Sequence, residues 1–587
     1  MRSDRLIVLK FGGSVLKDEA TLRLAVHETY RWRRDGWRVV AVVSALAGRT
    51  DTLLRLAQVT AAGHGSARGD ADPNAVASLI ATGELQSAGL LALHLDRAGV
   101  RASVLWPSSF GLVADGSPLD ATPVALDRAI LRGAIRRHGV VVVPGFAAED
   151  REGRPVVLGR GGSDLTALFV AHALGADRCR LVKDVDGLYE DDPADRPLPG
   201  LAPRRYSEAT FADALATDGS IVQHKAVRFA ASHGFAFELG SLSSTCVTRV
   251  GADRSTFAPG DRPRRLRVAL LGLGTVGGGV FQLLRQLLAQ FEVTVAAVRD
   301  PTKPRALGEE PPALTSDVME AVAGADVVVE LIGGIEPARS AVAAALAGGA
   351  HVVTANKALI AEHGQALEAL ATAHGRSLRY SASVGGSMPI LEAIAGRPAG
   401  VRSIRAVLNG TTNFVLDQVS TGASFAEAVA AAQRAGFAEA DPTRDLHGLD
   451  AADKLCVLAG RLGASLRPEN VERDELSEAT VTAALAAASS NGGPLRHVAT
   501  LSLAGGRPRA EVRLLQVGKG DPLARARNVG NRAVLEWEDG STQVVSGKGA
   551  GRWPTAEAVV ADLLAILREA PARKTALESQ AVAAVTA

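Results

Sequence analysis

Residues 266–277 read LRVALLGLGTVG, an apolar run that enters a glycine-rich turn and continues into the helix-like stretch 280–290 (VFQLLRQLLAQ). The glycines have G-x-G-x-x-G spacing. Between a strand and a helix, glycines at this spacing permit a tight turn and let the backbone approach a pyrophosphate at the helix N-terminus. The stretch therefore predicts a parallel α/β fold that binds a dinucleotide through Gly272, Gly274, Thr275, Val276 and Gly277.

The end of the next predicted strand bears on which dinucleotide binds. This strand, 293–298, is followed by RDPTK at residues 299–303. Folds that prefer NAD often place an acid here to accept the ribose hydroxyls, whereas a basic residue suits the 2′-phosphate of NADP. Because Arg299 comes first and Lys303 is close, NADP is the predicted cofactor and NAD the alternative. The simpler interpretation is two solvated basic residues.

The composition is that of a soluble globular protein. The 587 residues are 47% hydrophobic and 22% charged, a length that corresponds to roughly three to five domains. Sixty-five basic and 63 acidic side chains give a formal charge of +2, too small for a broad nucleic-acid-binding surface. Three scattered cysteines exclude a disulfide framework and suit a reducing compartment. No apolar run approaches about 18 residues, so we expect a cytoplasmic protein without membrane or nucleic-acid partners.

A second strand-to-helix start lies at the beginning of the chain, where LIVL at 6–9 precedes KFGGS at 10–14. Short apolar runs alternate with Ala-rich helical segments on both sides of a polar stretch rich in Gly, Pro and Arg. This alternation predicts two parallel sheets covered by helices. We expect an α/β domain at 1–250, a linker at 251–265, a dinucleotide-binding domain at 266–400, an α+β domain at 401–570 and a tail at 571–587. The predicted strands are 39–43, 140–143, 180–182, 293–298, 327–331 and 351–354.

Two glycine turns in the first domain are suited to phosphate. One follows Lys10, and the other lies in VLGRGGSD at 157–164, before a helix. Backbone N–H groups in such turns bind phosphate, and Lys10 adds a positive charge. The acidic stretch 183–193 (KDVDGLYEDDP) suits adenine, ribose or Mg²⁺. This inventory predicts phosphoryl transfer from ATP, although a tight turn beside a solvated lysine is the simpler interpretation of the first turn.

These motifs resemble the amino-acid kinase superfamily, and aspartate kinases in particular. KFGGSVL, the segment 44–51, the stretch 82–88, GRGGSD and DVDGLY occur in that order within residues 1–240. The resemblance implies catalytic roles for Lys10, which holds the transferred phosphate, and for Asp164, which organises the phosphoryl centre. It implies contacts to ATP from Lys10, Gly12, Gly13, Ser14, Lys183, Asp184 and Tyr189, and contacts to L-aspartate from Ser44, Thr50, Glu84, Arg160 and Ser163.

The first half departs from aspartate kinases in three ways. Lys183 stands where those kinases usually have Thr, and Gln223-His224-Lys225 stands where His-Pro-Lys or His-Pro-Arg is usual. Only about 25 residues separate Lys225 from the predicted linker, too few for the paired ACT-type regulatory domains. The departures keep two alternatives open: a kinase-like module that binds or dimerises without catalysis, and a kinase for another acid such as glutamate.

In the second half, two stretches carry polar and charged residues that suit a binding site. VVTANK at 352–357 ends a strand where open α/β sheets bind ligands. Residues 436–454 (GFAEADPTRDLHGLDAADK) place acids and a lysine around a helix start, and Asp450 and Lys454 share a helix face. A surface ion pair is the simpler interpretation. However, the helix continues as apolar LCVLAG, so the pair is expected at the margin of a buried element.

These stretches closely resemble homoserine dehydrogenases. LLGLGTVGGGV, VVELIGG, HVVTANKALIAEHG, SVGGSMPI, LNGTTNFVL, the 436–454 motif and GKGAGRWPTAEAVVADL follow that family's order across 266–566. The resemblance implies that Lys454 exchanges a proton at the substrate oxygen with help from Lys357, which suits hydride addition to an aldehyde. It implies that Glu439, Asp445, Asp450 and Lys454 hold homoserine, and that Thr354, Lys357, Gly436, Gly549 and Gly551 approach the nicotinamide cofactor.

The family also uses sodium or a similar cation. The resemblance implies that backbone carbonyls of Val384, Gly386 and Met388 would bind it together with an acid, but Ser381 occupies the position of that acid. The resemblance therefore implies a weakened or empty cation site. About 20 residues follow Leu567, too few for the ACT-type domain that many of these dehydrogenases carry at the C-terminus.

The predicted fold class is α/β: an amino-acid-kinase-like parallel-sheet sandwich, then a Rossmann domain, then an α+β substrate and dimerisation domain. The predicted function is bifunctional. One site would phosphorylate L-aspartate with Mg-ATP, and another would interconvert aspartate semialdehyde and homoserine with NADP or NAD. The intervening reduction needs a thiol nucleophile that no cysteine here is placed to supply, so another protein must perform it. The family resemblance also implies a homodimer or higher homo-oligomer.

Overall fold

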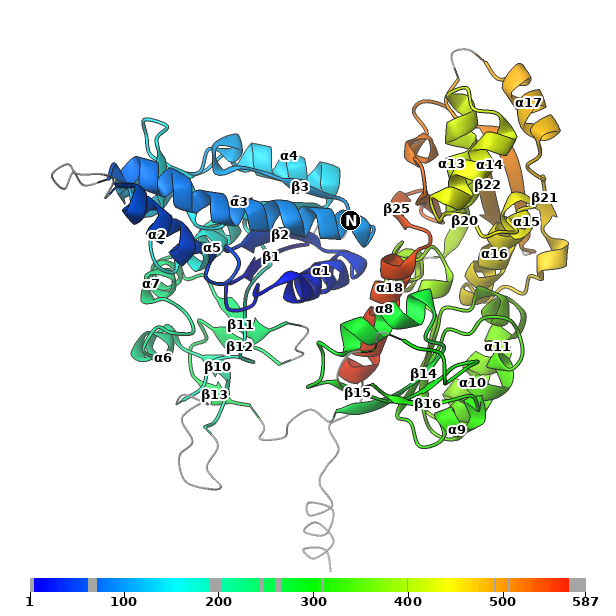
Figure 1. Ribbon diagram of the computed structural model, residues 1–587, viewed down its shortest axis with the longest axis horizontal. Helices are drawn as coiled ribbons and strands as arrows, with labels where there is room; N and C mark the ends of the chain where they lie inside the picture. Colours follow the sequence, from blue (N-terminus) through cyan, green and yellow to red (C-terminus); the bar gives the residue numbers. More distant parts are fainter. Residues whose placement is uncertain are drawn as a thin grey trace, which may run out of the picture. The chain divides into compact units, whose positions relative to one another are not determined.

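The computed structural model describes residues 5–61, 71–190, 203–242, 246–258, 265–305, 307, 311–397, 400–489, 492–504 and 507–569. It divides into two compact units, Met1–Gly260 and Asp261–Ala587. The chain runs from blue to green through the first unit and from green to red through the second (Figure 1). The division falls within residues 251–265, the stretch predicted to be a linker.

A nine-stranded sheet forms the centre of the first unit, in the order β13-β10-β12-β11-β9-β1-β2-β6-β3. From β11 to β3 all neighbouring strands are parallel, so their carboxyl ends lie along one edge, where open α/β sheets bind ligands. The strands are β1 (Leu6–Phe11), β2 (Arg38–Val43), β3 (Ala102–Val104), β6 (Val140–Pro144), β9 (Arg178–Lys183), β10 (Tyr206–Ala209), β11 (Phe237–Ser241), β12 (Thr248–Val250) and β13 (Thr256–Phe257).

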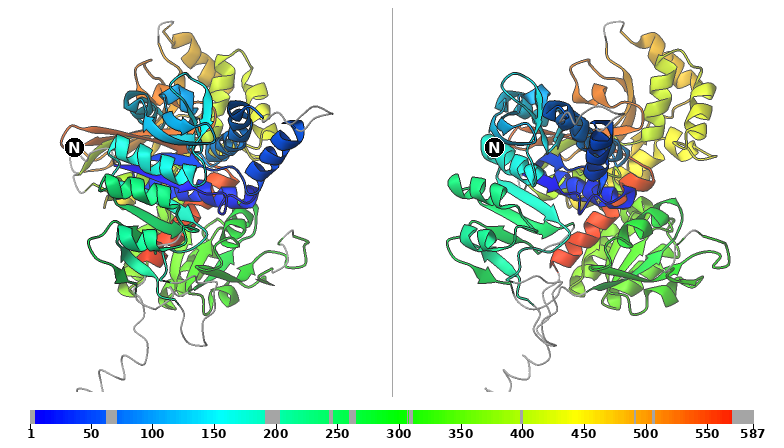
Figure 2. Two further views of the ribbon diagram at one scale, coloured as in Figure 1. Left: turned by 90° about the vertical axis from the view of Figure 1, so that its left-hand side faces the viewer. Right: turned by 60° about the vertical axis from the view of Figure 1, so that its left-hand side comes forward.

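Helices cover both faces of this sheet (Figure 2), which explains the nearly complete burial of β1, β2 and β6. Helices α1 and α3 pack on one face, and α4 and α5 on the other. A small sheet in the order β5-β4-β7-β8 completes the unit. These elements are α1 (Glu19–Arg34), α2 (Arg49–Ala61), α3 (Pro73–Arg97), α4 (Arg128–His138), α5 (Gly162–Leu174), α6 (Phe211–Ala216), α7 (His224–Ser232), β4 (Val113–Ser117), β5 (Asp120–Ala125), β7 (Ala147–Glu149) and β8 (Pro155–Val157).

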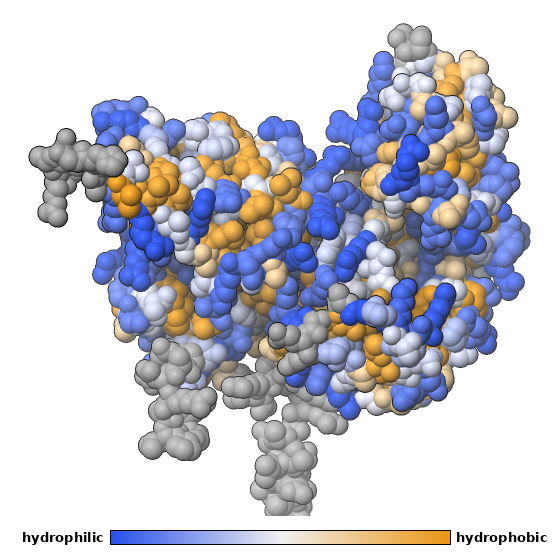
Figure 3. All heavy atoms as spheres, in the orientation of Figure 1, coloured by the Kyte–Doolittle hydropathy of each residue, from blue (hydrophilic) through white to orange (hydrophobic). Residues whose placement is uncertain are grey.

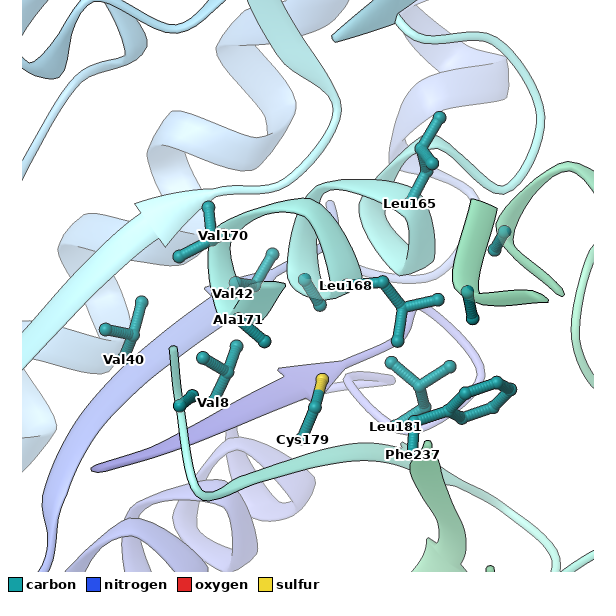
Figure 4. Packing of buried hydrophobic residues seen from close by; sticks show 14 of the residues in the cluster. Val8, Val40, Val42, Leu165, Leu168, Val170, Ala171, Cys179, Leu181 and Phe237 are labelled. Atoms are coloured by element: carbon teal, nitrogen blue, oxygen red, sulfur yellow. The ribbon is translucent and has the colours of Figure 1, made fainter. Parts of the chain in front are cut away.

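Helix α5 is anchored by the largest part of the first unit's core. Its apolar side, including Leu168 and Ala171, joins Val8 of β1 and Leu181 of β9 in one buried cluster (Figure 4). Burying a leucine side chain stabilises a fold by about 1.5–3 kcal/mol. This packing fixes the start of α5 at the carboxyl edge of the sheet, where GRGGSD lies.

Helix α3 is the one helix of the described residues that is long and apolar enough to cross a membrane, with a hydropathy of 1.4 over a window that is 44% buried. It packs against α2, β6 and β8, so in this structure it is a helix that covers one face of the sheet. Glu84 lies within its apolar sequence. Hydrophobic side chains reach the surface of the first unit (Figure 3), among them Leu93 of α3, which is 69% exposed.

The second unit begins with a six-stranded parallel sheet in the order β16-β15-β14-β17-β18-β19. Counted from β14 this is the order 3-2-1-4-5-6 of Rossmann folds, as predicted. The last helix, α18, returns to pack on α8 of this sheet. The elements are β14 (Leu266–Leu271), α8 (Thr275–Leu284), β15 (Phe291–Ala297), β16 (Ala313–Thr315), α9 (Val318–Val322), β17 (Val327–Glu330), α10 (Ala338–Ala347), β18 (His351–Thr354), α11 (Lys357–Ala373), β19 (Leu378–Arg379) and α18 (Arg552–Glu569).

A second, largely antiparallel sheet follows, in the order β21-β23-β22-β20-β24-β25. Helix α16 buries an apolar face against it, and α11 packs along α16. The elements are α12 (Ile390–Ala395), β20 (Val401–Val407), α13 (Gly410–Ser420), α14 (Phe425–Arg434), α15 (Thr443–Leu446), α16 (Leu449–Arg461), β21 (Glu472–Arg473), α17 (Glu478–Ala487), β22 (Leu495–Ser502), β23 (Arg509–Gln516), β24 (Gly530–Trp537) and β25 (Thr542–Lys548).

The α/β fold class and all six predicted strands are confirmed. Several strand ends differ from the predicted ones by one or two residues, and two other boundaries differ as well. Thr256–Phe257 lies in the stretch predicted as linker but pairs with β10, so the first unit's sheet extends into that stretch. The helix predicted over 280–290 instead begins at Thr275 and ends at Leu284.

Candidate active sites

A cavity of about 440 Å³ opens at the carboxyl edge of the first unit's sheet. It lies where β1, β2 and β6 end and where α5 begins, so motifs far apart in sequence meet there. The residues lining it include eight of those predicted to bind ATP or aspartate: Lys10, Gly13, Ser14, Ser44, Thr50, Glu84, Arg160 and Ser163.

Glycines allow the backbone turns around this cavity. A Cβ at Gly12 would lie 2.9 Å from the Lys10 Nζ, so only glycine lets the ammonium come that close. Gly161 has a φ of +77°, and a Cβ there would lie 2.3 Å from the Gln223 side chain. Gly161 caps α5 without a side-chain bond. The Gly162 and Asp164 N–H groups donate to the carbonyls of Gly159 and Gly161 at 3.0 and 3.1 Å, so the turn is fixed by its own backbone, and the positive end of the helix faces the cavity.

Asp164 is held between two lysines. Its Oδ1 lies 2.7 Å from Lys10 Nζ and its Oδ2 accepts a hydrogen bond of 2.8 Å from Lys183 Nζ. Burial opposes ionisation of this carboxyl, but the two ammonium groups lower its pKa to about 2. Burial also lowers the pKa of Lys183 to about 8, against the attraction of Asp164. Asp164 therefore fixes two cations beside the glycine turns.

Glu84 is the buried acid of the cavity. Burial raises its pKa to about 8, although it accepts hydrogen bonds from Phe146 N and, at 2.9 Å, from Ser163 Oγ. Ser44 Oγ in turn donates to Ser163 Oγ at 3.0 Å. Glu84 is therefore largely protonated at neutral pH and becomes a carboxylate when a cationic group approaches it.

Four predicted ATP residues do not line this cavity. Gly12 lies beside the Lys10 side chain, Lys183 is the last residue of β9, and Asp184 and Tyr189 follow β9. Phe146, which the sequence prediction missed, both lines the cavity and binds Glu84 through its backbone N–H. Phe146 acts through its backbone N–H, so the identity of its side chain gives no sign of this role in the sequence.

The glycine turn of the second unit has the shape of a dinucleotide site. Gly272 has a φ of +105°, and a Cβ on Gly277 would lie 2.0 Å from the Gly272 carbonyl oxygen. A Cβ on Gly274 would meet no atom within 4 Å, so open space lies beside it. Gly272 therefore permits the tight turn, Gly277 allows the helix to pack closely on the turn, and Gly274 leaves room for a pyrophosphate to approach the backbone. Arg299 and Lys303 are exposed beyond the end of β15.

Lys357, Asp450 and Lys454 form a cluster near the starts of α11 and α16, in which Asp450 and Lys454 are buried and Lys357 is partly exposed. The two oxygens of Asp450 lie 2.7 Å from Lys357 Nζ and 2.5 Å from Lys454 Nζ. The lysines lower the pKa of Asp450 despite its burial, and Asp450 in turn raises the pKa of Lys357. Lys454 is only 6% exposed. The surface-ion-pair interpretation of Asp450 and Lys454 is therefore wrong.

Two asparagines that the sequence prediction missed connect this cluster to its surroundings. Asn409 Nδ2 donates to Asp445 Oδ1 at 2.6 Å and to Asp450 Oδ2 at 2.9 Å. Asn531 Nδ2 donates to the Leu408 carbonyl, which also accepts from Lys454 Nζ. Asn409 caps α13 with its amide oxygen, so LNGTTNFVL signals a helix start. The sequence gives no sign that the amide nitrogen reaches two acids.

The other predicted residues of this site are placed differently. Thr354 is buried and donates to Glu330, which also accepts from the N–H groups of the turn after β17. Gly549 lies against Asn531, and Gly551 precedes α18 with a φ of +118°. Gly436 and Glu439 lie on an exposed loop, where the Glu439 carbonyl accepts from Gln433.

The predicted cation turn is tied to the C-terminal helix. Ser381 donates its N–H and its hydroxyl to Asp562 of α18, at 3.0 and 2.9 Å. The Met388 carbonyl accepts the Ile390 N–H at 2.8 Å. Among the residues that the structure describes, no three His, Cys, Asp or Glu side chains gather as a metal site. Ser381, which stands in the position of the family's acid, is thus engaged by Asp562 of α18.

A parallel sheet in 3-2-1-4-5-6 order, a pyrophosphate-type glycine turn and two lysines held by the buried Asp450 define a dinucleotide-dependent oxidoreductase. A phosphate-binding α/β fold of the kinase kind precedes it. Residues 272–381 match the model of the homoserine dehydrogenase NAD binding domain, and residues 389–564 match that of homoserine dehydrogenase. The chain belongs to the homoserine dehydrogenase family. Residues 5–235 match the amino acid kinase family, so the chain is a fusion of a kinase and a dehydrogenase.

Curated relatives agree with this assignment. The homoserine dehydrogenase of Synechocystis sp. is 38% identical over 321 residues, which are 51% of this chain and 73% of that protein. That of Corynebacterium glutamicum is 36% identical over 54% of this chain and 75% of its own length. The crystal structure of a homoserine dehydrogenase from Thiobacillus denitrificans matches 52% of this chain and 74% of its own, with 35% identity and a TM-score of 0.48.

Proposed function

We propose that the first unit phosphorylates the β-carboxylate of L-aspartate with Mg-ATP. The observation that supports this proposal best is the single cavity that Lys10, Glu84 and Arg160 share. Arg160 suits a substrate carboxylate, and Glu84 suits an α-ammonium group, whose approach favours its ionised form. Lys10 and the N-terminus of α5 suit the phosphate. A small amino acid with a second carboxylate matches this set of groups.

The test uses the full chain with MgATP and one acid at a time. We expect ADP release with L-aspartate, and none with L-glutamate or without an acid. ADP release with glutamate alone would favour the alternative substrate. Absence of release with every acid, in a chain whose dehydrogenase is active, would favour a kinase-like module that binds or dimerises without catalysis.

We propose that the second unit interconverts L-aspartate 4-semialdehyde and L-homoserine with NADP. When bound, the nicotinamide supplies or accepts the hydride. Lys454 is suited to hold a positive charge beside the substrate oxygen and to exchange a proton with it, and Asp450 fixes its position. Asp445 and Glu439 are the groups proposed for the substrate ammonium. The observation that supports this assignment is the buried Lys454, held by Asp450 beside Lys357.

The preference for NADP rests on Arg299. We expect Arg299→Ala to raise the KM for NADPH about 10-fold or more, because a charge-assisted hydrogen bond to phosphate is worth about 1.5–3 kcal/mol. The turnover number should change little. Steady-state kinetics with NADPH measure the effect, and NADH serves as the matched ligand that lacks the 2′-phosphate. An equal rise of the KM for both cofactors would contradict the assignment.

Three further properties complete the proposal. The turn at 381–388 binds a monovalent cation weakly, because Ser381 supplies no carboxylate and is engaged by Asp562. The chain forms a homodimer or higher oligomer, as the resemblance to homoserine dehydrogenases implies. It resides in the cytoplasm, in keeping with the buried cysteines Cys179 and Cys456, neither of which forms a disulfide.

A further inference from the structure

The carboxyl ends of β1 and β9 bring two lysines to one carboxylate. These strands are parallel neighbours, with Lys10 opposite Leu181 and Phe11 opposite Val182, so Lys183 follows one residue beyond the paired stretch. The Lys10 and Lys183 side chains are 8% and 10% exposed, and the Asp164 side chain between them is 4% exposed. Lys183 is thus as much a part of this buried group as Lys10.

The group has an excess of positive charge. Asp164 neutralises one of the two ammonium groups, and Glu84, the nearby acid that also attracts Lys10, is protonated for the most part at neutral pH. The remaining acid that attracts Lys183 is Asp184, which is exposed. Burying an uncompensated charge is costly, and one lysine would be enough to pair with Asp164. An anion that binds beside Lys10 and Lys183 would balance the extra positive charge, and this would explain why a second lysine is buried there.

Another lysine beside the glycine turn at 159–162, Lys225, is already engaged. Lys225 Nζ donates to Asp120 Oδ1 at 2.9 Å and to the carbonyls of Ala121 and Leu158 at 2.7 and 3.2 Å. An ammonium group has three N–H donors, so these three acceptors use all of them. Lys225 therefore holds β5 against the glycine turn and has no donor left for phosphate.

We propose that Lys183 is a second phosphoryl-binding cation of the kinase, which acts with Lys10 on the group being transferred. This inference rests on the proposed kinase function. In the transfer, a carboxylate oxygen forms a bond to the γ-phosphorus while the bond to the β–γ bridging oxygen breaks, and ADP leaves with that electron pair. Lys183 gives up no proton; its charge stabilises the oxygens of the transferring group, as a fixed cation does in such reactions.

The first test compares Lys183→Met, Lys183→Arg and the exposed control Lys17→Met in the full chain. Loss of one preorganised charge-stabilising group lowers kcat by about 100- to 1,000-fold, so we expect this loss for Lys183→Met, with the KM for aspartate within about threefold of wild type. Lys183→Arg should recover much of the rate, and Lys17→Met should match wild type. Dehydrogenase turnover of the same samples reports whether the chain is folded.

The second test separates this role from that of a mere counter-ion to Asp164. Calorimetric titration measures the binding of MgADP alone and of MgADP with aluminium fluoride and aspartate, which together mimic the transferring phosphoryl group. We expect Lys183→Met to weaken the second complex by about the same factor as kcat and to leave MgADP binding nearly unchanged. Equal weakening of both complexes, or a variant with wild-type kcat, would overturn the inference. A wild-type chain without kinase turnover would overturn the kinase proposal and this inference with it.

Discussion

Lys454→Met is expected to lower dehydrogenase turnover by about 1,000-fold or more, because removing a proton-exchanging group that also stabilises a developing alkoxide affects two terms of the barrier. The methionine side chain keeps most of the volume of the lysine, and Asp450 keeps Lys357 as a partner. The unit should therefore remain folded. Oxidation of NADPH with aspartate semialdehyde, followed by absorbance, measures the loss.

Kinase turnover in the same variant provides the internal control, and Lys519→Met, at an exposed lysine of the second unit, provides the matched substitution. Lys454→Met should keep kinase turnover near that of wild type, and Lys519→Met should keep dehydrogenase turnover near that of wild type. If Lys454→Met removed both activities from a folded chain, the two sites would not be independent. If it retained dehydrogenase turnover, the proton-exchanging group would have to be a different side chain.

The sequence predicted this part of the site well because its motifs are local. The glycines at 272, 274 and 277 lie within one strand–turn–helix unit, and Asp450 and Lys454 lie on one turn of α16. Their spacing alone determines that they meet. Asn409 and Asn531 were missed because their contacts span at least 36 residues and depend on how α13 and β24 pack.

The same distinction applies to the first unit. The glycine turns were read from the sequence, and the cavity collects most of the residues predicted around them. The meeting of Lys10 and Lys183 at Asp164 was not predicted, because it depends on the parallel pairing of β1 with β9, in which Lys10 lies opposite Leu181, 171 residues along the chain. The sequence showed that Lys183 departs from the family pattern, but it did not show that Lys183 pairs with Asp164.

Asp164→Asn is expected to reduce kinase turnover by about 1,000-fold and to destabilise the first unit by about 3–5 kcal/mol. The substitution keeps the shape of the side chain but removes the charge that holds Lys10 and Lys183, so two buried ammonium groups repel each other without a counter-ion. Calorimetry of the full chain should show the first unit's transition at a lower temperature. Dehydrogenase turnover should stay at the wild-type level.

The pH dependence of this destabilisation distinguishes charge from packing. The folded-state pKa of Asp164 is lowered to about 2, whereas an unfolded aspartate has a pKa of about 3.9. The ion pairs therefore stabilise the wild type fully above this higher value, and the stabilisation is lost as the pH falls toward the lower one. The difference between Asp164→Asn and wild type should shrink over that window. Asp115→Asn, which breaks an exposed pair with Arg151, should have little effect at any pH. A destabilisation by Asp164→Asn that stayed constant through the window would show that packing, rather than the two ammonium groups, makes this aspartate necessary.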